Sequence, residues 1–230
     1  MRLAIMQPYF FPYIGYFQLI SAVNKFVFYD DVNFIKNGWI NRNRIVINGS
    51  PNYFTVNLND ASPNKLIKDI EFSFNKSKLI KKIETTYKKA PFYQNIEPLI
   101  LDVLSLETQS ISDLAIYSVR KVCTYLQISI SFEISSINYS QTKGLTRTER
   151  LKKICTLNDA NEYINPYGGR VLYKKKEFLE KNINLLFLKS NLREYKQFAK
   201  EFIPGMSIID IMMFNSPERI NEMLNDYELK

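Results

Sequence analysis

Residues 2–29 constrain the fold more than any other stretch of the chain. The apolar run RLAIM (residues 2–6) stops at a Gln-Pro pair and is typical of a buried strand. Apolar residues then recur at helical spacing from Ile14, and KFVFY (residues 25–29) is typical of a second strand. A helix that joins two neighbouring strands forms a βαβ unit, in which the strands run parallel. The sequence therefore predicts an α/β fold that begins with two parallel strands.

The remainder of the chain continues to alternate between strand and helix patterns. Strands are predicted at residues 44–49, 52–58, 69–74, 128–135, 162–165 and 183–188. Helices are predicted at residues 77–90, 92–104, 110–126, 146–157, 172–182, 205–215 and 216–229, with capping-box pairs at Ser110–Asp113 and Thr146–Glu149. No repeat or linker interrupts the pattern, so we expect one domain over residues 1–230. It is predicted to be a Rossmann-like, mostly parallel sheet flanked by helices, with an added β-hairpin region and a helical insertion.

The formal net charge of +8 is compatible with nucleic acid, an anionic membrane surface or phosphate-bearing small substrates as partners. The lysines are spread along helical segments, so a solvated lysine-rich surface is the alternative. Cys123 and Cys155 belong to no ligand-spaced cluster, and the chain contains no histidine. Buried free thiols in a reducing compartment are therefore expected, and a zinc site is excluded.

Residues 3–24 carry no charge, which invites comparison with a signal peptide or a membrane span. Pro8 and Pro12 lie one helical turn apart, and each removes a backbone donor and breaks a helix. Arg2 is the one positive residue that precedes the run, and no small-residue cleavage site follows it. We therefore expect a folded N-terminal segment, no transmembrane segment and a cytoplasmic protein.

The aromatic turn at residues 7–16 follows the first strand, and residues 30–44 follow the second. Ligands of open α/β sheets bind beyond the carboxyl ends of the strands, so the two segments are expected to face one another and enclose a cleft. Gly15 would let the backbone approach the ligand. The alternative is that the rings fill the core, in which case buried tyrosine hydroxyls need polar partners.

The segment DDVNFIKNGWINRNR (residues 30–44) is the richest in polar chemistry. Arginine suits bidentate binding of phosphate or carboxylate, and Trp39 offers a flat face to a base or sugar. The alternative is a polar hairpin held by Asp–Arg pairs. The NPYGGR turn (residues 165–170) would offer backbone donors to an anion, and Ser207 and Asp210 either contact the ligand or cap a helix.

The tetrad at residues 13–16 is similar in spacing to the H-x-G-H signature of nucleotidylyltransferases, with both histidines replaced by tyrosine. A neutral phenol cannot supply the charge of an imidazolium. If the fold is nucleotidylyltransferase-like, the transfer chemistry is therefore expected to be changed or lost.

The chain also resembles the WbqC-like family, over residues 7–20, 26–45, 149–173 and 195–215. This resemblance implies a role in the synthesis of O-antigen and related surface polysaccharides, with glycyl transfer as the proposed activity. The implied partners are a nucleotide-linked or lipid-linked amino sugar and an activated acyl or aminoacyl donor such as an aminoacyl-tRNA. No cofactor is required by the sequence, although a nucleotide or Mg²⁺ held by Asp30–Asp31 is compatible with it.

Applied to these residues, the preferred hypothesis has Lys36 and one of Arg42 or Arg44 hold a phosphate. Asp30 or Asp31 would act as general base toward the attacking amine, and Trp39 or Tyr13 would stack on the nucleotide or sugar. The candidate catalytic residues are Asp30, Asp31 and Lys36; the candidate substrate-binding residues are Gln7, Tyr9, Tyr13, Gly15, Tyr16, Trp39, Asn41, Arg42, Asn43, Arg44, Gly168, Gly169, Ser207 and Asp210; no metal ligand is assigned. Two other functions remain open, a nucleotide-dependent activating enzyme and a non-catalytic nucleic-acid or accessory binding protein.

Overall fold

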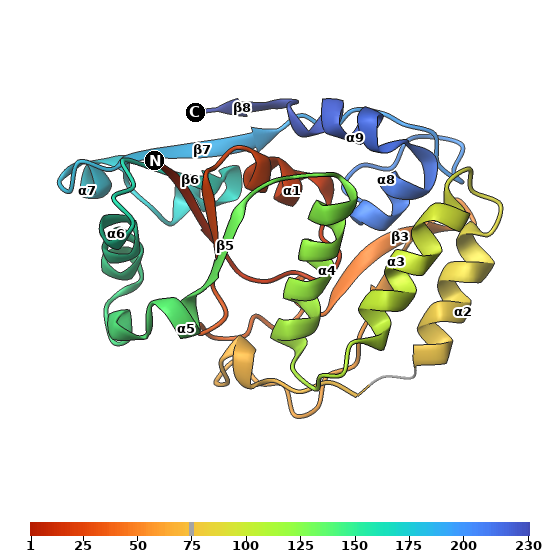
Figure 1. Cartoon of the computed structure of the whole chain (residues 1–230), viewed down its shortest axis with the longest axis horizontal. Coiled ribbons are helices and arrows are strands. Elements are labelled where there is room, and N and C mark those ends of the chain that lie inside the picture. Colours follow the sequence, from red (N-terminus) through yellow and green to blue (C-terminus); the bar gives the residue numbers. More distant parts are fainter. Residues whose placement is uncertain (74–75) are drawn as a thin grey trace.

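In residues 1–73 and 76–230, which the computed structural model describes, the centre is a six-stranded sheet in the order β5-β2-β1-β6-β7-β8 (Figure 1). Its strands are β1 (Arg2–Met6), β2 (Lys25–Phe28), β5 (Ser131–Ile134), β6 (Glu162–Pro166), β7 (Asn184–Ser190) and β8 (Tyr227–Leu229). All neighbouring pairs are parallel except β7 with β8. The prediction of a mostly parallel α/β sheet is confirmed.

Both faces of the sheet are buried, as expected for parallel strands covered by helices. Successive side chains of a strand point to opposite faces, so Leu3 and Ile5 enter one core while Ala4 enters the other. Phe26 and Phe28 lie in the same core as Ala4, and Val27 lies in the same core as Leu3. These near-continuous apolar runs explain why the first two strands take central positions.

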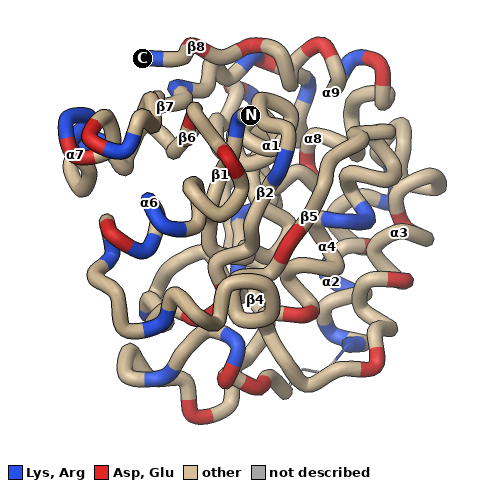
Figure 2. The backbone as a smooth tube through the Cα atoms, turned by 60° about the vertical axis from the view of Figure 1, so that its left-hand side comes forward, with Lys and Arg blue, Asp and Glu red and all other residues tan. Residues whose placement is uncertain are grey.

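The helices divide between the two faces of the sheet. The larger core includes residues of α1 (Ile14–Ser21), α2 (Lys76–Tyr87), α3 (Tyr93–Ser105), α4 (Ile111–Tyr125), α8 (Ile208–Phe214) and α9 (Pro217–Leu224). The smaller core, on the other face, includes residues of α6 (Arg147–Leu157) and α7 (Lys175–Leu179), and the short α5 (Ser135–Asn138) follows β5. Basic and acidic residues are interspersed along the backbone (Figure 2). No helix of the described chain is long and apolar enough to cross a membrane.

The predicted hairpin is formed by β3 (Arg42–Ile47) and β4 (Ser50–Thr55), which pair as a separate antiparallel sheet. Asn48 and Gly49 form its two-residue turn with φ of 50° and 74°. Positive φ at both central positions is the signature of the type I′ turn, which suits the twist of a tight hairpin and favours Asn-Gly.

Several predicted elements differ from the structure. Asp69 ends a 3-10 helix (Ile67–Asp69), and in residues 70–73 only Glu71 and Phe72 form isolated bridges, with Ser110 and Leu58; Phe74 lies outside the described residues. The helix predicted at 172–182 is shorter in the structure and spans Lys175–Leu179. It follows a 3-10 helix at Tyr167–Val171. The last predicted helix ends at Leu224, and the chain then adds β8 to the edge of the sheet.

The two capping predictions had different outcomes. The Ser110 side chain accepts a hydrogen bond from the Asp113 backbone N–H, as predicted. Thr146 is the N-cap of α6 but makes no side-chain capping hydrogen bond, and Glu149 instead pairs with Lys152 at 2.6 Å. The first turn of α6 is therefore not closed by the side chain predicted to cap it.

Candidate functional site

A cleft of about 1000 Å³ opens where the order of the strands reverses, between β1 and β6. If the six strands of this sheet are numbered along the chain, without the two hairpin strands, they lie in the spatial order 3-2-1-4-5-6. In sheets of this order, ligands bind beyond the carboxyl ends of the strands, at the point where the order reverses. The cleft is lined by the ends of β1 (residues 5–7), β2 (29 and 31–35) and β6 (163, 165 and 166), by residues 143–145 and the start of α6 (147, 150 and 151), by residues 63 and 66, and by the turn after β6 (168, 169, 172 and 173).

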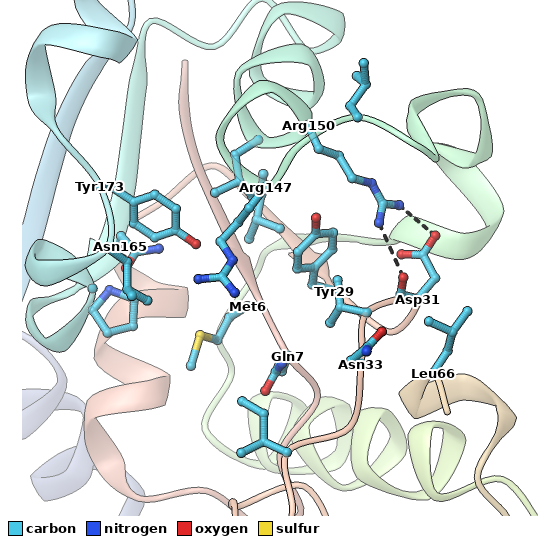
Figure 3. A pocket seen from close by; sticks show the side chains of 18 of the residues that line it. Met6, Gln7, Tyr29, Asp31, Asn33, Leu66, Arg147, Arg150, Asn165 and Tyr173 are labelled. Atoms are coloured by element: carbon cyan, nitrogen blue, oxygen red, sulfur yellow. Dashed lines mark hydrogen bonds and ion pairs between the residues drawn. The ribbon is translucent and has the colours of Figure 1, made fainter. Parts of the chain in front are cut away.

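Arg147, the first residue of α6, supplies a cation to the cleft. Its side chain extends from the helix into the space between Tyr173 and Tyr29 (Figure 3). Arg147 is exposed, and within the described chain its guanidinium has no hydrogen-bond or ion-pair partner. The N-terminus of α6 adds partial positive charge from its backbone N–H groups. This arrangement favours the binding of an anionic group of a ligand.

Neutral polar side chains surround this cation. Gln7, Asn33 and Asn165 line the cleft with Tyr29 and Tyr173 (Figure 3). Burial raises the pKa of Tyr29, against the opposing effect of the Arg150 charge, and burial also raises the pKa of Tyr173. Both phenols therefore keep their protons near neutral pH and can donate hydrogen bonds to a ligand.

A buried ion pair holds one wall of the cleft. Arg150 Nη2 lies 2.6 Å from Asp31 Oδ2, and Arg150 Nε donates to Thr142 Oγ1 at 2.9 Å. The Arg150 guanidinium also lies 4.8 Å from the centre of the Tyr29 ring. Asp31 neutralises Arg150, so Arg147 at the start of α6 and Lys143 in the loop before it are the cleft-lining cations that have no acidic partner among the described residues.

Four residues predicted from the sequence line the cleft: Gln7, Asp31, Gly168 and Gly169. The two glycines belong to the 3-10 turn after β6. A Cβ on Gly169 would overlap Asn165 Oδ1, whereas a Cβ on Gly168 would meet no atom within 4 Å. Close packing of the turn against Asn165 therefore explains the second glycine but not the first.

Asp30 is buried at the end of β2, outside the cleft lining. Its carboxylate accepts hydrogen bonds from Ser136 N at 2.9 Å and from the Ser136 and Ser135 hydroxyls at 2.6 and 3.0 Å. The carboxylate thus occupies the start of α5. Among residues 1–73 and 76–230, no group of three His, Cys, Asp or Glu side chains is placed to hold a metal ion.

Apart from Gln7, the aromatic turn packs into the core instead of lining the cleft. Tyr16 is buried, and its hydroxyl donates to the Gln7 carbonyl at 2.8 Å. Burial raises the pKa of Tyr9 to about 12, and the Tyr9 and Tyr16 rings lie 5.6 Å apart. A Cβ on Gly15 would overlap the Tyr13 ring and Ser190 Oγ, so this glycine accommodates a tyrosine of the same chain.

The N-terminus of α1 is covered by α8. Tyr13 forms a bridge with Ser207, and the Ile208 backbone N–H donates to the Pro12 carbonyl at 2.9 Å. The Ser207 hydroxyl donates to the Phe11 carbonyl at 2.7 Å. In dinucleotide-binding Rossmann folds this helix terminus holds the pyrophosphate. Here the protein itself occupies that position.

The segment at residues 30–44 contacts the aromatic turn, but its predicted binding side chains contact the protein. Asn43 Nδ2 donates to the Phe11 carbonyl at 2.8 Å, and Asn41 Nδ2 donates to the Val56 carbonyl at 2.7 Å. Arg42 Nε donates to the Gly38 carbonyl at 3.1 Å. The two segments are therefore adjacent, as expected, without enclosing a ligand cleft through these side chains.

Arg44, Trp39 and Lys36 of this segment also lie outside the cleft lining. The Arg44 guanidinium lies 5.6 Å from the Trp39 ring and donates to the Gly205 carbonyl at 3.4 Å. Lys36 is exposed in the loop before β3. Asp31 pairs with Arg150 and not with Arg42 or Arg44, so the Asp–Arg pairs of the alternative reading do not occur among the ion pairs of the described residues. The catalytic roles of Asp30, Asp31 and Lys36 remain predictions.

Ser207 and Asp210 belong to the start of α8. Ser207 is its N-cap and accepts from the Ile209 backbone N–H, which agrees with the capping alternative. Asp210 is fully buried and accepts hydrogen bonds from Tyr87, Tyr195 and Gln197, the last two at 2.8 Å. Burial raises the pKa of Asp210.

Sequence reasoning missed eight residues with polar side chains that line the cleft: Tyr29, Asn33, Lys143, Arg147, Arg150, Tyr163, Asn165 and Tyr173. Two of them carried a usable signal, because Tyr29 and Asn165 stand at the ends of predicted strands. Arg147 stands directly after a predicted N-cap. The strand order, which places these ends at one edge, cannot be read from a single sequence.

Comparison with known proteins relates the chain to one family. The model of the WbqC-like protein family matches residues 7–222. The uncharacterized protein Rv1507c of Mycobacterium tuberculosis (strain ATCC 25618 / H37Rv) is 28% identical over 218 residues, which cover 92% of each chain. No solved structure matches the chain.

Proposed function

The chain belongs to the WbqC-like protein family, and from this premise and the cleft we propose that it is a transferase of surface-polysaccharide synthesis. It moves a glycyl or related acyl group onto an amino sugar that carries a phosphate, through a nucleotide or a lipid. It acts in the cytoplasm, where such donors and acceptors are made.

The unpaired Arg147 guanidinium carries this proposal. It projects from a helix N-terminus into a cleft at the strand reversal, where α/β proteins bind phosphate-bearing ligands. A charge-assisted hydrogen bond from arginine to phosphate contributes about 1.5–3 kcal/mol. The neutral amides of Gln7, Asn33 and Asn165 suit the hydroxyl groups of a sugar, since each amide offers a donor and an acceptor.

The chemistry requires stabilisation of negative charge on the acyl carbonyl. When the amine of the sugar attacks, the carbonyl oxygen becomes an oxyanion, and a donor aimed at that oxygen lowers the barrier. Tyr29 is the donor we assign, because burial raises its pKa and Arg150 holds its ring. In this proposal Asp31 is a positioning residue that fixes Arg150. The amine attacks as the free base, the bond between the acyl carbon and the donor oxygen breaks when the oxyanion collapses, and the donor leaves as an alcohol that takes up the proton lost by the amine.

A nucleotide-dependent activating enzyme is the second candidate. The strand order favours it, because this order is common among nucleotide-binding proteins. Release of pyrophosphate from ATP or CTP in the presence of a sugar acceptor would identify that activity. A steep salt dependence of RNA binding with no preference for small ligands would indicate the nucleic-acid alternative.

The direct test is a transfer assay. The protein is incubated with nucleotide-linked amino sugars and donors such as glycyl-tRNA, and N-acylated product is measured by mass spectrometry. Tyr29→Phe should lower the rate about 100-fold with little change in sugar binding. Tyr53→Phe, on the exposed hairpin, is the matched control. Absence of product from every pair, together with absence of sugar binding, would contradict the proposal.

A further inference from the structure

Exposed apolar side chains surround the mouth of the cleft. Ile35, Leu145 and Leu172 all line the cleft, yet they are 53%, 45% and 56% exposed. Val171, which precedes Leu172, is 81% exposed. Apolar side chains gathered at one opening mark a surface that is covered by something else, because their exposure to water is unfavourable.

Basic residues accompany these apolar side chains. Lys143 lines the cleft beside Leu145, and Lys174, Lys175 and Lys176 follow the cleft residue Tyr173 directly. All four lysines are exposed, and none forms an ion pair among the described residues. The basic residues of α6 and α7 are visible in Figure 2. The mouth therefore combines apolar side chains that need cover with cations that need anionic partners.

We propose that this mouth docks on an anionic lipid bilayer. Val171 and Leu172 enter the headgroup region, and the lysines at 174–176 contact lipid phosphates, as in other peripheral proteins that combine apolar and basic residues. The charge favours an anionic lipid surface over an apolar protein partner, because the exposed Val171 and Leu172 stand next to the three exposed lysines at 174–176. This inference rests on the proposed function and deepens it: the phosphate that reaches Arg147 belongs to a lipid-linked sugar.

Flotation of the full chain with lipid vesicles tests the docking. Binding to vesicles of phosphatidylglycerol and phosphatidylcholine should exceed binding to pure phosphatidylcholine, and should weaken as salt is added. The double variant Lys175→Glu/Lys176→Glu should bind at least about tenfold more weakly. Val171→Asp should also weaken binding, while its thermal unfolding should stay unchanged because the side chain is exposed.

Leu157→Asp is the matched control, since Leu157 is also exposed but lies at the opposite end of α6 from Arg147. Equal binding by Val171→Asp and Leu157→Asp, or no preference for anionic vesicles, would overturn the docking proposal. Loss of a dimer in Val171→Asp without a change in vesicle binding would also overturn it, in favour of an interface between copies.

Neither variant touches the cleft lining, so stabilisation by a soluble nucleotide-linked sugar should be the same in both. If no phosphate-bearing sugar stabilises any form while vesicle binding follows the predicted pattern, the proposed function fails and the docking surface stands.

Discussion

Asp31 Oδ2 lies 2.6 Å from Arg150 Nη2, and the two side chains are 0% and 7% exposed. The pair joins the loop after β2 to the second turn of α6, on the wall of the cleft. Arg150 in turn lies over the Tyr29 ring. One buried ion pair therefore connects the stability of this wall to the position of a cleft hydroxyl.

Replacement of either partner of this pair should be costly. Asp31→Asn or Arg150→Met leaves the other charge buried without its partner, and the free energy of unfolding should fall by about 3–5 kcal/mol. Asp31→Asn/Arg150→Met should lose less than the sum of the two single variants, because it buries no unpaired charge. Urea unfolding of the four proteins measures the coupling. Additive losses would show that the two side chains act independently.

Arg147→Ala should weaken binding of a phosphate-bearing sugar about 10–100-fold, as expected for the loss of an arginine–phosphate contact. Its melting temperature without ligand should stay near that of the wild type, because the side chain is exposed and unpaired in the described structure. Lys153→Ala removes an exposed charge from the same helix and serves as control. Titration calorimetry measures both affinities. Equal affinities of the two variants would remove Arg147 from the site.

The adjacent glycines of the turn after β6 should respond differently to alanine. A Cβ at Gly169 overlaps Asn165 Oδ1, so Gly169→Ala must displace an amide whose Nδ2 donates to the Tyr163 hydroxyl at 2.7 Å. Ligand affinity should fall about fivefold, since about 1 kcal/mol of hydrogen bonding is lost. Gly168→Ala meets open space and should bind as the wild type does. Ligand-induced thermal shifts compare the two, and a larger effect at Gly168 would contradict this account.

The buried Asp210 should make stability depend on pH in an unusual direction. Burial raises its pKa in the folded state, so its contribution to stability is complete below the ordinary aspartate pKa of about 4 and is lost as the pH rises through the folded-state value. Asp210→Asn cannot ionise there. Its free energy of unfolding should therefore rise relative to that of the wild type as the pH is raised above about 4.

Asp102→Asn provides the opposite case for comparison. The hydrogen bond from Lys121 lowers the pKa of Asp102, so this carboxylate stabilises the fold above the ordinary pKa and loses that effect as the pH falls. The free energy of unfolding of Asp102→Asn should therefore fall relative to that of the wild type as the pH rises. Urea unfolding at several pH values measures both differences. Parallel pH profiles for the two variants would contradict the role of burial at Asp210.

Much of the fold could be predicted because the local patterns are strong. The strands RLAIM and KFVFY lie next to each other and parallel, with Leu3 opposite Lys25. The Asn48–Gly49 turn and the Ser110 cap follow from residue types with clear backbone preferences. The predicted strand at 69–74 was wrong for its described residues because an alternating pattern does not show whether a partner strand exists.

The site was harder to predict because it depends on contacts that are distant in the sequence. The sequence around Tyr13 is the same whether its ring lines a cleft or packs against Gly15. Only the three-dimensional packing shows that the ring lies against Gly15. Arg150 pairs with Asp31 although several helices and strands lie between the two residues in the sequence. The chemistry of residues 30–44 correctly drew attention to the end of β2, but the arginine without an acidic partner in the cleft, Arg147, comes from α6.

The central position of β1 has a consequence for how the chain is made. β1 pairs on one side with β2, its near neighbour in sequence, and on the other with β6, where Arg2 lies opposite Glu162. At synthesis rates of about 5–20 residues per second, that second side stays without its partner for roughly ten seconds or more. A growing chain with an open apolar strand edge is prone to wrong pairing, so we expect ribosome-associated chaperones to bind this protein before α6 and β6 emerge.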